Sequence, residues 1–294
     1  MLHSMYSPRL PAEIIKELYM RAKQQEIIAA LGVEPTIQPI KEIEKRSKFL
    51  ADYLGQTGFN GFVLGVSGGQ DSLLAGILAQ RVIKLRRQSG HDCRLHTMLL
   101  PYGIQHDRAD AELAVETIKS YGESSVIEHD IDIQPSVDAL VADLCTDGQV
   151  ISDFDKGNIK ARIRMMTQYA IAGACELLVV GTDHAAESVT GFFTKFGDGA
   201  ADIMPLSGLT KRQGWAMLNA LHVPEHLLHK VPTADLLDDR PAQPDEVELG
   251  LRYDDIDDYL EGKEVDPKIA EKIEERYDKT QHKRNLPVAY RSRQ

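Results

Sequence analysis

Cysteine and long apolar runs are both scarce in this sequence. Its 294 residues include three cysteines, Cys93, Cys145 and Cys175, which are far apart and form no Cys-x-x-Cys pair. Neither a zinc site nor a dithiol redox centre is therefore indicated. No apolar run approaches the roughly 18 residues that span a bilayer, and the first residues lack the basic-then-apolar layout of a secretory signal. We expect a cytoplasmic protein with free thiols and no membrane partner.

Positive charge is also in deficit, because 34 Lys and Arg residues face 45 Asp and Glu residues, for a formal net charge of -11. A large nucleic-acid-binding face would be a local exception to this field, so we expect no nucleic-acid partner. Anionic ligands would need dedicated basic pockets. The sequence has no internal repeat, and its 43% hydrophobic and 27% charged residues are typical of a globular protein.

Apolar segments of strand length alternate with longer amphipathic segments through the middle of the chain. Strands are expected at residues 62–66, 95–100, 125–129 and 177–180, and helices at 73–85, 108–121, 137–145 and 156–174. This alternation predicts an α/β fold with a doubly wound parallel sheet and flanking helices. Ligands of such sheets bind at the carboxyl ends of the strands, so the loops there are expected to surround one crevice.

The chain is expected to form a single domain over residues 1–294, with helical additions around an α/β core at 58–222. Residues 1–57 repeat apolar side chains at helical spacing, and Pro35 and Pro39 separate two predicted helices. Residues 223–245 are rich in proline and acidic side chains, which predicts a lid loop rather than core. Residues 246–294 are predicted to form C-terminal helices, at 246–250, 256–260 and 267–281.

A glycine-rich segment follows the first predicted strand: Gly65-Val66-Ser67-Gly68-Gly69-Gln70-Asp71-Ser72. Its backbone N–H groups and the N-terminus of the next helix face the strand-end crevice, which makes the segment an anion cradle. The paired glycines admit a phosphate to the main chain, the serines can donate hydroxyl groups, and Asp71 can bind a magnesium that bridges phosphates. The alternative is an ordinary turn in which Asp71 or Ser72 caps the helix.

No lysine follows this segment, so it is not a Walker A loop, and it lacks the three-glycine dinucleotide pattern. It resembles the SGGxDS loop of the N-type ATP pyrophosphatases, which include NAD, GMP and asparagine synthetases and RNA-modifying adenylating enzymes. The rest of the chain, over residues 40–290, resembles the ammonia-dependent NAD synthetase family. The matching segments are Leu100-Pro-Tyr-Gly-Ile-Gln105, Lys156-Gly-Asn-Ile-Lys-Ala-Arg-Ile-Arg-Met165, Gly181-Thr-Asp-His-Ala-Ala-Glu187, Gly191-Phe-Phe-Thr-Lys-Phe-Gly-Asp198, Ala201-Asp202, Pro232-Thr-Ala-Asp-Leu236 and His282-Lys283.

The resemblance implies an adenine-nucleotide α-hydrolase-like fold and the final step of NAD biosynthesis. In that reaction ATP activates deamido-NAD as an adenylate, and ammonia converts it to NAD with release of AMP and pyrophosphate. The implied partners are ATP, deamido-NAD and ammonia, with Mg²⁺ as cofactor. A homodimer is also implied, with the dinucleotide pocket shared between two subunits.

The family's site positions can be carried over one by one. The ATP-binding positions match the loop from Gly65 to Ser72 together with Gln105, Thr182, Lys211 and Thr233. The magnesium positions match Asp71 and Glu187. The deamido-NAD positions match Arg162, Lys195, Asp202, His282 and Lys283. Asp71, Lys211 and Asp202 are expected to be catalytic, and Asp202 is expected to lie near the ammonia site.

Some of these positions also have a physical reason, and each has a plainer alternative. Thr182 and Glu187 follow the strand at 177–180 and can reach the crevice that holds Asp71, but the same segment could be an ordinary helix start. Arg162 points away from the apolar stripe of its helix, as a solvated side chain also would. His282 and Lys283 could equally belong to a charged tail.

The chain departs from the family at two places near Gln105. Leu99 stands where the family commonly has arginine, and Asp107 and Arg108 stand where an Asp-Glu pair is usual. The adenine end of the ATP site is therefore expected to be built differently.

Three other functions fit parts of the pattern. A synthetase fed by glutamine would need an activated nucleophile, and none of the three cysteines lies in a convincing catalytic setting. A fused glutaminase would also add a long extension, so we expect free ammonia as the donor. An RNA-thiolating enzyme would need catalytic cysteines or a basic RNA face. A nucleotide-binding regulator without catalysis would have no use for a second magnesium carboxylate.

Overall fold

A computed structural model describes residues 21–105, 107–122, 125–233, 238–239 and 243–290. Its centre is a parallel sheet of four strands in the order β3-β2-β1-β4. The strands are β1 (Gly61–Gly65), β2 (Arg94–Leu99), β3 (Val126–Asp130) and β4 (Leu178–Val179). All four lie where the sequence predicts strands, which confirms the predicted α/β class.

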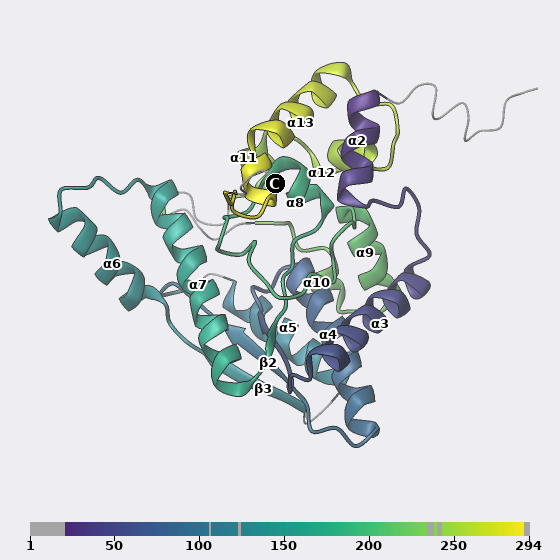
Figure 1. The fold of residues 1–294 in the computed structure, drawn as a ribbon, viewed down its shortest axis with the longest axis vertical. Coiled ribbons are helices and arrows are strands. Elements are labelled where there is room, and N and C mark those ends of the chain that lie inside the picture. Colours follow the sequence, from purple (N-terminus) through teal and green to yellow (C-terminus); the bar gives the residue numbers. More distant parts are fainter. Residues whose placement is uncertain (1–20, 106, 123–124, 234–237, 240–242, 291–294) are drawn as a thin grey trace, which may run out of the picture.

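Two layers of helices enclose the sheet because the side chains of β1 alternate between two apolar clusters. Phe62 and Leu64 belong to a cluster shared with α3, α4, α5 and α9, whereas Val63 belongs to a cluster shared with α6 and α7. Figure 1 shows the resulting arrangement. The bounds are α3 (Pro39–Thr57), α4 (Gln70–Gln88), α5 (Arg108–Ser120), α6 (Gln134–Thr146), α7 (Asp153–Cys175) and α9 (Lys211–Ala220).

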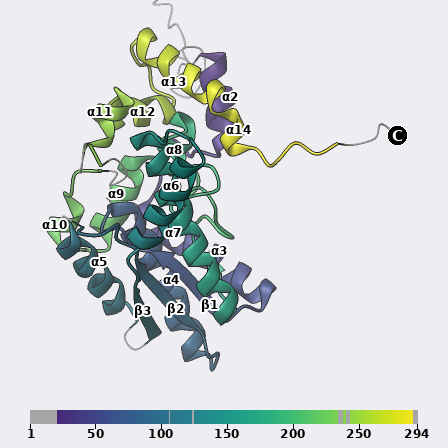
Figure 2. The ribbon, with the colours of Figure 1, turned by 90° about the vertical axis from the view of Figure 1, so that its left-hand side faces the viewer.

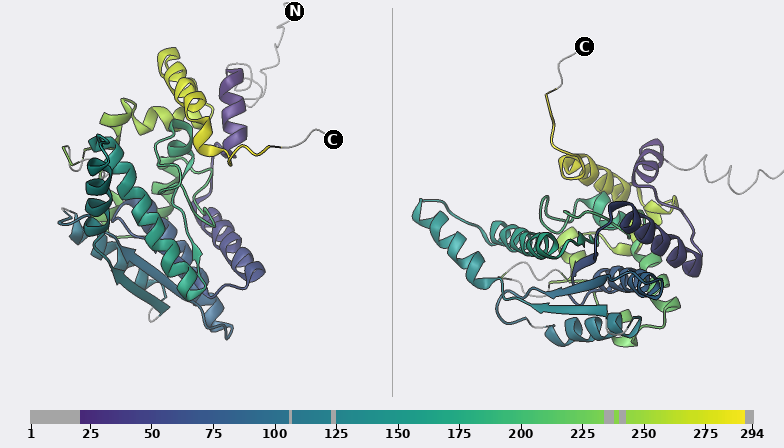
Figure 3. Two further views of the ribbon diagram at one scale, coloured as in Figure 1. Left: turned by 60° about the vertical axis from the view of Figure 1, so that its left-hand side comes forward. Right: turned by 60° about the horizontal axis from the view of Figure 1, so that its bottom comes forward.

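Helix α7 begins after Ser152, whose hydroxyl oxygen accepts the N–H of Asp155 at 3.1 Å. Acidic residues in its first turn also suit the positive end of the helix dipole. Helix α6 contacts α7 but projects from the body of the molecule (Figures 1 and 3). Val137 of α6 is buried, whereas Leu140 is 41% exposed. One face of α6 therefore remains open in the single chain.

A second group of helices packs around its own apolar cluster, to which Ile27 and Tyr259 contribute fully buried side chains. This group joins the two ends of the described chain, since α2 lies beside α13 in Figures 1 and 2. Helix α8 links it to the sheet. The bounds are α2 (Ala22–Leu31), α8 (Ala185–Thr190), α11 (Asp245–Leu249), α12 (Tyr253–Leu260), α13 (Pro267–Lys279) and α14 (Gln281–Arg284).

The start of the predicted lid, residues 223–245, differs from the expectation. Helix α10 (Glu225–Leu228) lies there, and Leu227 and Leu228 are 1% and 2% exposed within the main apolar cluster. Pro224 is the N-cap residue of α10, so this proline marks the start of a helix. The proline-rich composition indicated a loop instead, because proline is common both in loops and at helix starts. Residues 234–237 and 240–242 of the predicted lid, and residues 1–20 of the predicted N-terminal helices, lie outside the described residues.

Within the described ranges, the chain forms no helix with the length and apolar content that a bilayer crossing requires. The helices predicted near 246–250, 256–260 and 267–281 are present as α11, α12 and α13. Helix α9 was not predicted, and α8 corresponds to the helix start that the sequence offered as an alternative for the segment of Thr182 and Glu187. Both helices carry side chains of the candidate site.

Candidate active site

A cavity of about 490 Å³ opens at the carboxyl ends of the strands, in the crevice that the alternating pattern predicts. Its volume lies within the range of small-molecule sites. The glycine-rich loop, α7, the segment after β4 and the first residue of α9 all contribute to its walls. The predicted ATP residues Gln105, Thr182, Lys211 and Thr233 line it.

The glycine-rich loop turns directly from β1 into α4. Gly68 has a φ of 82°, and a Cβ atom there would come within 2.7 Å of the Ala111 backbone nitrogen, so glycine is required on both counts. Ser67 Oγ accepts the N–H of Gly69 at 3.2 Å. The N-cap residue is Gly69, with no side-chain cap. The alternative, in which Asp71 or Ser72 is the N-cap residue, is therefore wrong.

Asp71 instead faces Glu187 of α8 and His184, which is the N-cap residue of that helix. Ligand atoms of Asp71, His184 and Glu187 all lie within 4.8 Å of one another. Burial raises the pKa of the Glu187 carboxyl well above its usual range, and the nearby Asp71 and Asp183 raise it further. Burial also lowers the pKa of His184 to about 4, which keeps this imidazole neutral. Crowded, buried carboxylates of this kind suit a hard divalent cation such as Mg²⁺.

Lys211 supplies a positive charge beside this group. Its Nζ atom lies 2.7 Å from Asp71 Oδ2 and 5.3 Å from the centre of the Tyr253 ring. Burial raises the pKa of Asp71, but the charge of Lys211 and its hydrogen bond outweigh this effect, and the net pKa is lowered. Glu187 has no comparable lysine partner among the described residues. A cation bound between the two carboxylates would therefore complete the charge balance.

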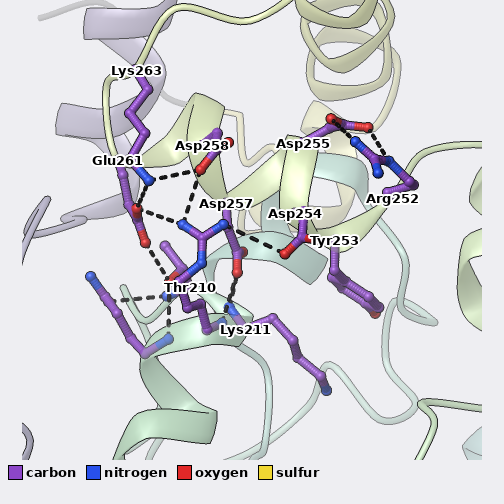
Figure 4. Close-up of polar contacts among 12 residues, drawn as sticks. Thr210, Lys211, Arg252, Tyr253, Asp254, Asp255, Asp257, Asp258, Glu261 and Lys263 are labelled. Carbon is purple, nitrogen blue, oxygen red and sulfur yellow. Dashed lines mark hydrogen bonds and ion pairs between the residues drawn. The ribbon is translucent and has the colours of Figure 1, made fainter.

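Helix α12 holds the start of α9, and so the backbone of Lys211, in place (Figure 4). Asp257 accepts the backbone N–H groups of Lys211 at 3.0 Å and Arg212 at 2.7 Å. Thr210 caps the same helix through a reciprocal pair of hydrogen bonds with Gln213. These contacts satisfy the free N–H groups of the first turn, and they direct the Lys211 side chain towards the cavity.

A second lysine that the sequence interpretation missed, Lys230, lies near Gln105. Its Nζ atom is 2.5 Å from Asp107 Oδ2 and 2.9 Å from Asp110 Oδ2. Asp107 Oδ1 in turn accepts the Gln105 side-chain N–H at 2.8 Å. Arg108, the other departure from the family, pairs with Asp130 at the end of β3. The unusual Asp107-Arg108 pair thus ties the loop after β2 to two neighbouring segments.

The predicted deamido-NAD residues fall into three places, and Asp202 is separate from the other four. Arg162, Lys195 and His282 lie together outside the cavity wall, because Arg162 Nη2 donates to the Lys195 carbonyl at 3.4 Å and Lys195 Nζ donates to the His282 carbonyl. Lys283 lines the cavity, and its Nζ atom donates to the carbonyls of Gly191 at 2.8 Å and Phe193 at 2.7 Å. The tail alternative does not hold for Lys283, which is anchored.

Asp202 lies apart from both places. Its Oδ2 atom accepts the N–H of Val179 at 2.8 Å, and its Oδ1 atom accepts the Tyr169 hydroxyl at 3.4 Å. It does not line the cavity, whereas Asp198, four residues earlier, does. Burial raises the pKa of Asp198, and Asp198 Oδ1 accepts the Thr194 N–H at 2.9 Å. Asp198 stands in a segment that resembles the family, and this was the only available signal for it.

The sheet, the strand-end cavity and the glycine-rich loop define the adenine-nucleotide α-hydrolase-like fold, which structural relatives of this chain share. The sequence model of the NAD synthase family matches residues 42–287, and the chain belongs to that family. The resemblance described from the sequence is thereby confirmed.

Individual relatives agree with this membership. The NH(3)-dependent NAD(+) synthetase of Bacillus licheniformis is 53% identical over 270 residues, which cover 90% of this chain and 96% of that protein. The solved NAD+ synthetase of Burkholderia pseudomallei is 47% identical with a TM-score of 0.77, over 90% of this chain and 97% of that one. The NMN synthetase of Francisella tularensis is 37% identical with a TM-score of 0.75, over 87% and 99% of the two chains.

Proposed function

We propose that this chain catalyses the ATP-dependent amidation of deamido-NAD by ammonia, which yields NAD, AMP and pyrophosphate through an NAD-adenylate. The observation that carries the proposal is one cavity in which the Ser67–Ser72 loop, with its Asp71, faces Glu187 and Lys211. A carboxylate is a poor acceptor for an amine until it is joined to a better leaving group. Attack of the substrate carboxylate on the α-phosphorus of ATP supplies that group.

The glycine-rich loop would hold the departing pyrophosphate. Its N–H groups and the start of α4 provide donors and a positive dipole end for phosphate oxygens. Asp71 and Glu187 would hold Mg²⁺, which neutralises phosphate charge when bound. Lys211 and Thr233 line the same cavity and would face the charge that moves to pyrophosphate as the bond breaks.

Ammonia must arrive without its extra proton, because ammonium has no lone pair with which to attack the acyl carbon. A buried carboxylate with a raised pKa is a suitable proton acceptor. Asp198 has this property and lines the cavity, whereas Asp202 is occupied by Val179 and Tyr169. We therefore assign the proton-accepting role to Asp198. Asp202 would instead position the segment after β4 through its hydrogen bonds.

The dinucleotide would extend from the cavity towards the basic group formed by Arg162, Lys195 and His282. A homodimer that shares this pocket is supported by open apolar side chains on both helices, Leu140 of α6 at 41% and Met166 of α7 at 56% exposure. Sedimentation at micromolar concentration should then report a dimer. A monomer would contradict this part of the proposal. A cytoplasmic location stays a prediction.

The direct test supplies ATP, MgCl₂, ammonium chloride and deamido-NAD, and measures NAD and pyrophosphate together. Equal amounts of both are expected in the complete mixture. Omission of ATP, MgCl₂ or deamido-NAD should abolish both products, whereas omission of ammonium chloride should abolish NAD and limit pyrophosphate to about one molecule per active site, because adenylation precedes the attack of ammonia. Nicotinic acid mononucleotide is the matched control, since one structural relative is an NMN synthetase. Faster turnover of the mononucleotide than of deamido-NAD would overturn the proposed substrate. Continuous pyrophosphate release without amide formation, in the presence of ammonium chloride, would overturn the proposed reaction.

A further inference from the structure

A buried imidazole, that of His184, lies beside the two carboxylates of the candidate cation site, Asp71 and Glu187. His184 is 2% exposed. Among the residues that the structure describes, neither of its ring nitrogens has a hydrogen-bond partner. A buried polar atom without a partner costs about 1–3 kcal/mol. An imidazole with two such atoms therefore indicates a ligand that the described chain does not itself supply.

The backbone around His184 is fixed by hydrogen bonds on both sides. The His184 carbonyl accepts the N–H of Ser188 at 2.9 Å, and the N–H of Ala185 donates to the Leu209 carbonyl at 2.8 Å. His184 is the N-cap residue of α8, a position that normally holds a side chain able to accept a backbone N–H. Its imidazole makes no such capping bond. The start of the helix therefore gives no reason for a histidine at this place.

The Nε2 atom of His184 lies 3.6 Å from Asp71 Oδ1 and 3.7 Å from Glu187 Oε1. Both distances exceed the roughly 3.2 Å of an N–H···O hydrogen bond. At metal-ligand distances of about 2.1 Å, two ligands of one cation are about 3.0 Å apart at right angles and about 4.2 Å apart on opposite sides. Both measured distances fall between these limits. The three side chains are thus spaced as ligands of one ion.

The other sides of the two carboxylates are turned to different tasks. Asp71 uses its Oδ2 atom for Lys211, at 2.7 Å, and this leaves Oδ1 for the side that faces His184. Asp71 and Glu187 line the catalytic cavity, whereas His184 does not, so a substrate there would meet the carboxylates and not the ring. Burial lowers the pKa of His184 to about 4, and the resulting neutral imidazole is the form that binds metals.

We propose that His184 is a third protein ligand of this cation site, and that the site accordingly binds a first-row transition-metal ion such as Mn²⁺ more tightly than Mg²⁺. The inference rests on the cation site of the proposed function. Mg²⁺ takes oxygen ligands and keeps several waters, whereas an imidazole nitrogen suits transition-metal ions. Such an ion also gives His184 Nε2 the partner that it lacks among the described residues.

Untagged wild-type protein with MnCl₂ and without nucleotide provides the first test. Electron spin echo spectroscopy detects a nitrogen nucleus that is bonded to Mn²⁺. Saturable binding with a coupled nitrogen is expected, and labelling of the histidines with ¹⁵N should change the coupling. Bound Mn²⁺ without a coupled histidine nitrogen, or no saturable binding of Mn²⁺, would overturn the proposal.

The substitution His184→Gln then assigns the nitrogen and tests the preference. Its affinity for Mn²⁺ should fall by about tenfold or more, whereas its affinity for Mg²⁺, measured by competition, should change by less than about threefold. His96→Gln is the matched control, because His96 is also buried, at 6% exposure, but contacts His129 at 2.9 Å. The control should bind Mn²⁺ as the wild type does. Unchanged Mn²⁺ affinity in His184→Gln, or an equal loss for both ions, would refute the preference. The labelled wild type decides the question should this variant not fold.

The assay for NAD separates failure of this inference from failure of the proposed reaction. NAD formation in MgCl₂, by a protein whose bound Mn²⁺ shows no nitrogen coupling, would overturn the role of His184 and leave the reaction standing. Nitrogen coupling in a protein that forms no NAD would overturn the reaction and support His184 as a ligand.

Discussion

The substitution Lys211→Met is expected to remove the positive charge that stabilises the ionised Asp71 carboxylate. The two side chains are 2.7 Å apart and only 11% and 25% exposed. Methionine keeps the unbranched length of lysine, so packing changes little. Removal of one partner from a buried ion pair typically costs about 3–5 kcal/mol, because the other charge remains unpaired. Since Asp71 keeps some exposure, we expect a loss near the lower end, about 3 kcal/mol in the free energy of unfolding.

Magnesium ions should restore part of this loss. In the Lys211→Met variant, Asp71 and Glu187 face each other without the lysine, and a divalent cation would supply the missing positive charge. Added MgCl₂ is therefore expected to stabilise the variant more than the wild type. Turnover should still fall strongly, because no lysine then faces the departing pyrophosphate.

The stabilisation that the ion pair of Lys211 and Asp71 provides should be confined to a range of pH. Burial raises the pKa of Asp71, but the charge of Lys211 brings it below its usual 3.8. The stabilising effect of the ionised Asp71 is therefore present above pH 3.8 and is lost as pH falls through the lowered pKa. Burial lowers the pKa of Lys211, but Asp71 and Glu187 raise it above 10.5, so its effect is present below pH 10.5 and is lost as pH rises further. The wild type should be more stable than the variant throughout the range from about pH 5 to pH 9.

Urea denaturation followed by circular dichroism, with and without MgCl₂, measures these differences. Lys48→Met is the matched control, because Lys48 and Asp52 are 2.6 Å apart but 73% and 52% exposed. Its cost should stay within about 1 kcal/mol, as for other surface pairs. The reasoning is refuted if Lys211→Met costs no more than Lys48→Met, or if magnesium stabilises both variants equally.

Three further outcomes are expected. Asp71→Asn should keep the circular dichroism spectrum of the wild type but lose most NAD formation, because one carboxylate charge for magnesium is removed; near-normal turnover at ordinary magnesium would contradict the site. Ammonium chloride and not glutamine should serve as the donor, and a Cys93→Ser, Cys145→Ser, Cys175→Ser variant that folds should keep ammonia-driven activity; efficient NAD formation from ammonia-free glutamine would count against this. Limited proteolysis within residues 229–244 should slow when an ATP analogue is present, since Val231 is 60% exposed while Thr233 lines the cavity; equal cleavage rates would argue against a lid.

The sheet and the phosphate loop could be predicted because their signals are local. Phe62 to Val66 form a short apolar run, and the glycines and serines that follow leave few structures other than a strand, a turn and a helix. The cavity at the strand ends follows from the parallel order alone. Family resemblance then added Glu187 and Lys211, which the structure brings beside Asp71.

Other parts of the site depend on contacts between distant segments and could not be predicted in this way. Asp257 orients Lys211 from 46 residues further along the chain. Leu227 and Leu228 are core residues inside a segment whose prolines indicate a loop. Asp198 is buried and lines the cavity, whereas Asp202 does not line it, and no spacing in the sequence reports this difference. The proposal that Asp198 accepts the proton rests on it.

The two carboxylates beside Lys211 are attached to different apolar clusters. Asp71 lies in the first turn of α4, whose Leu73 and Leu74 belong to the main cluster. Glu187 is on α8, whose Val189 belongs to the same cluster as Ile27 of α2. The distance between the two carboxylates therefore depends on how these two packed units of the fold are placed relative to each other. A cation held by both would act as a non-covalent crosslink between these units. Loosening of α2 should accordingly weaken magnesium binding at a site that α2 does not touch, and bound magnesium should in turn protect α2 from hydrogen exchange.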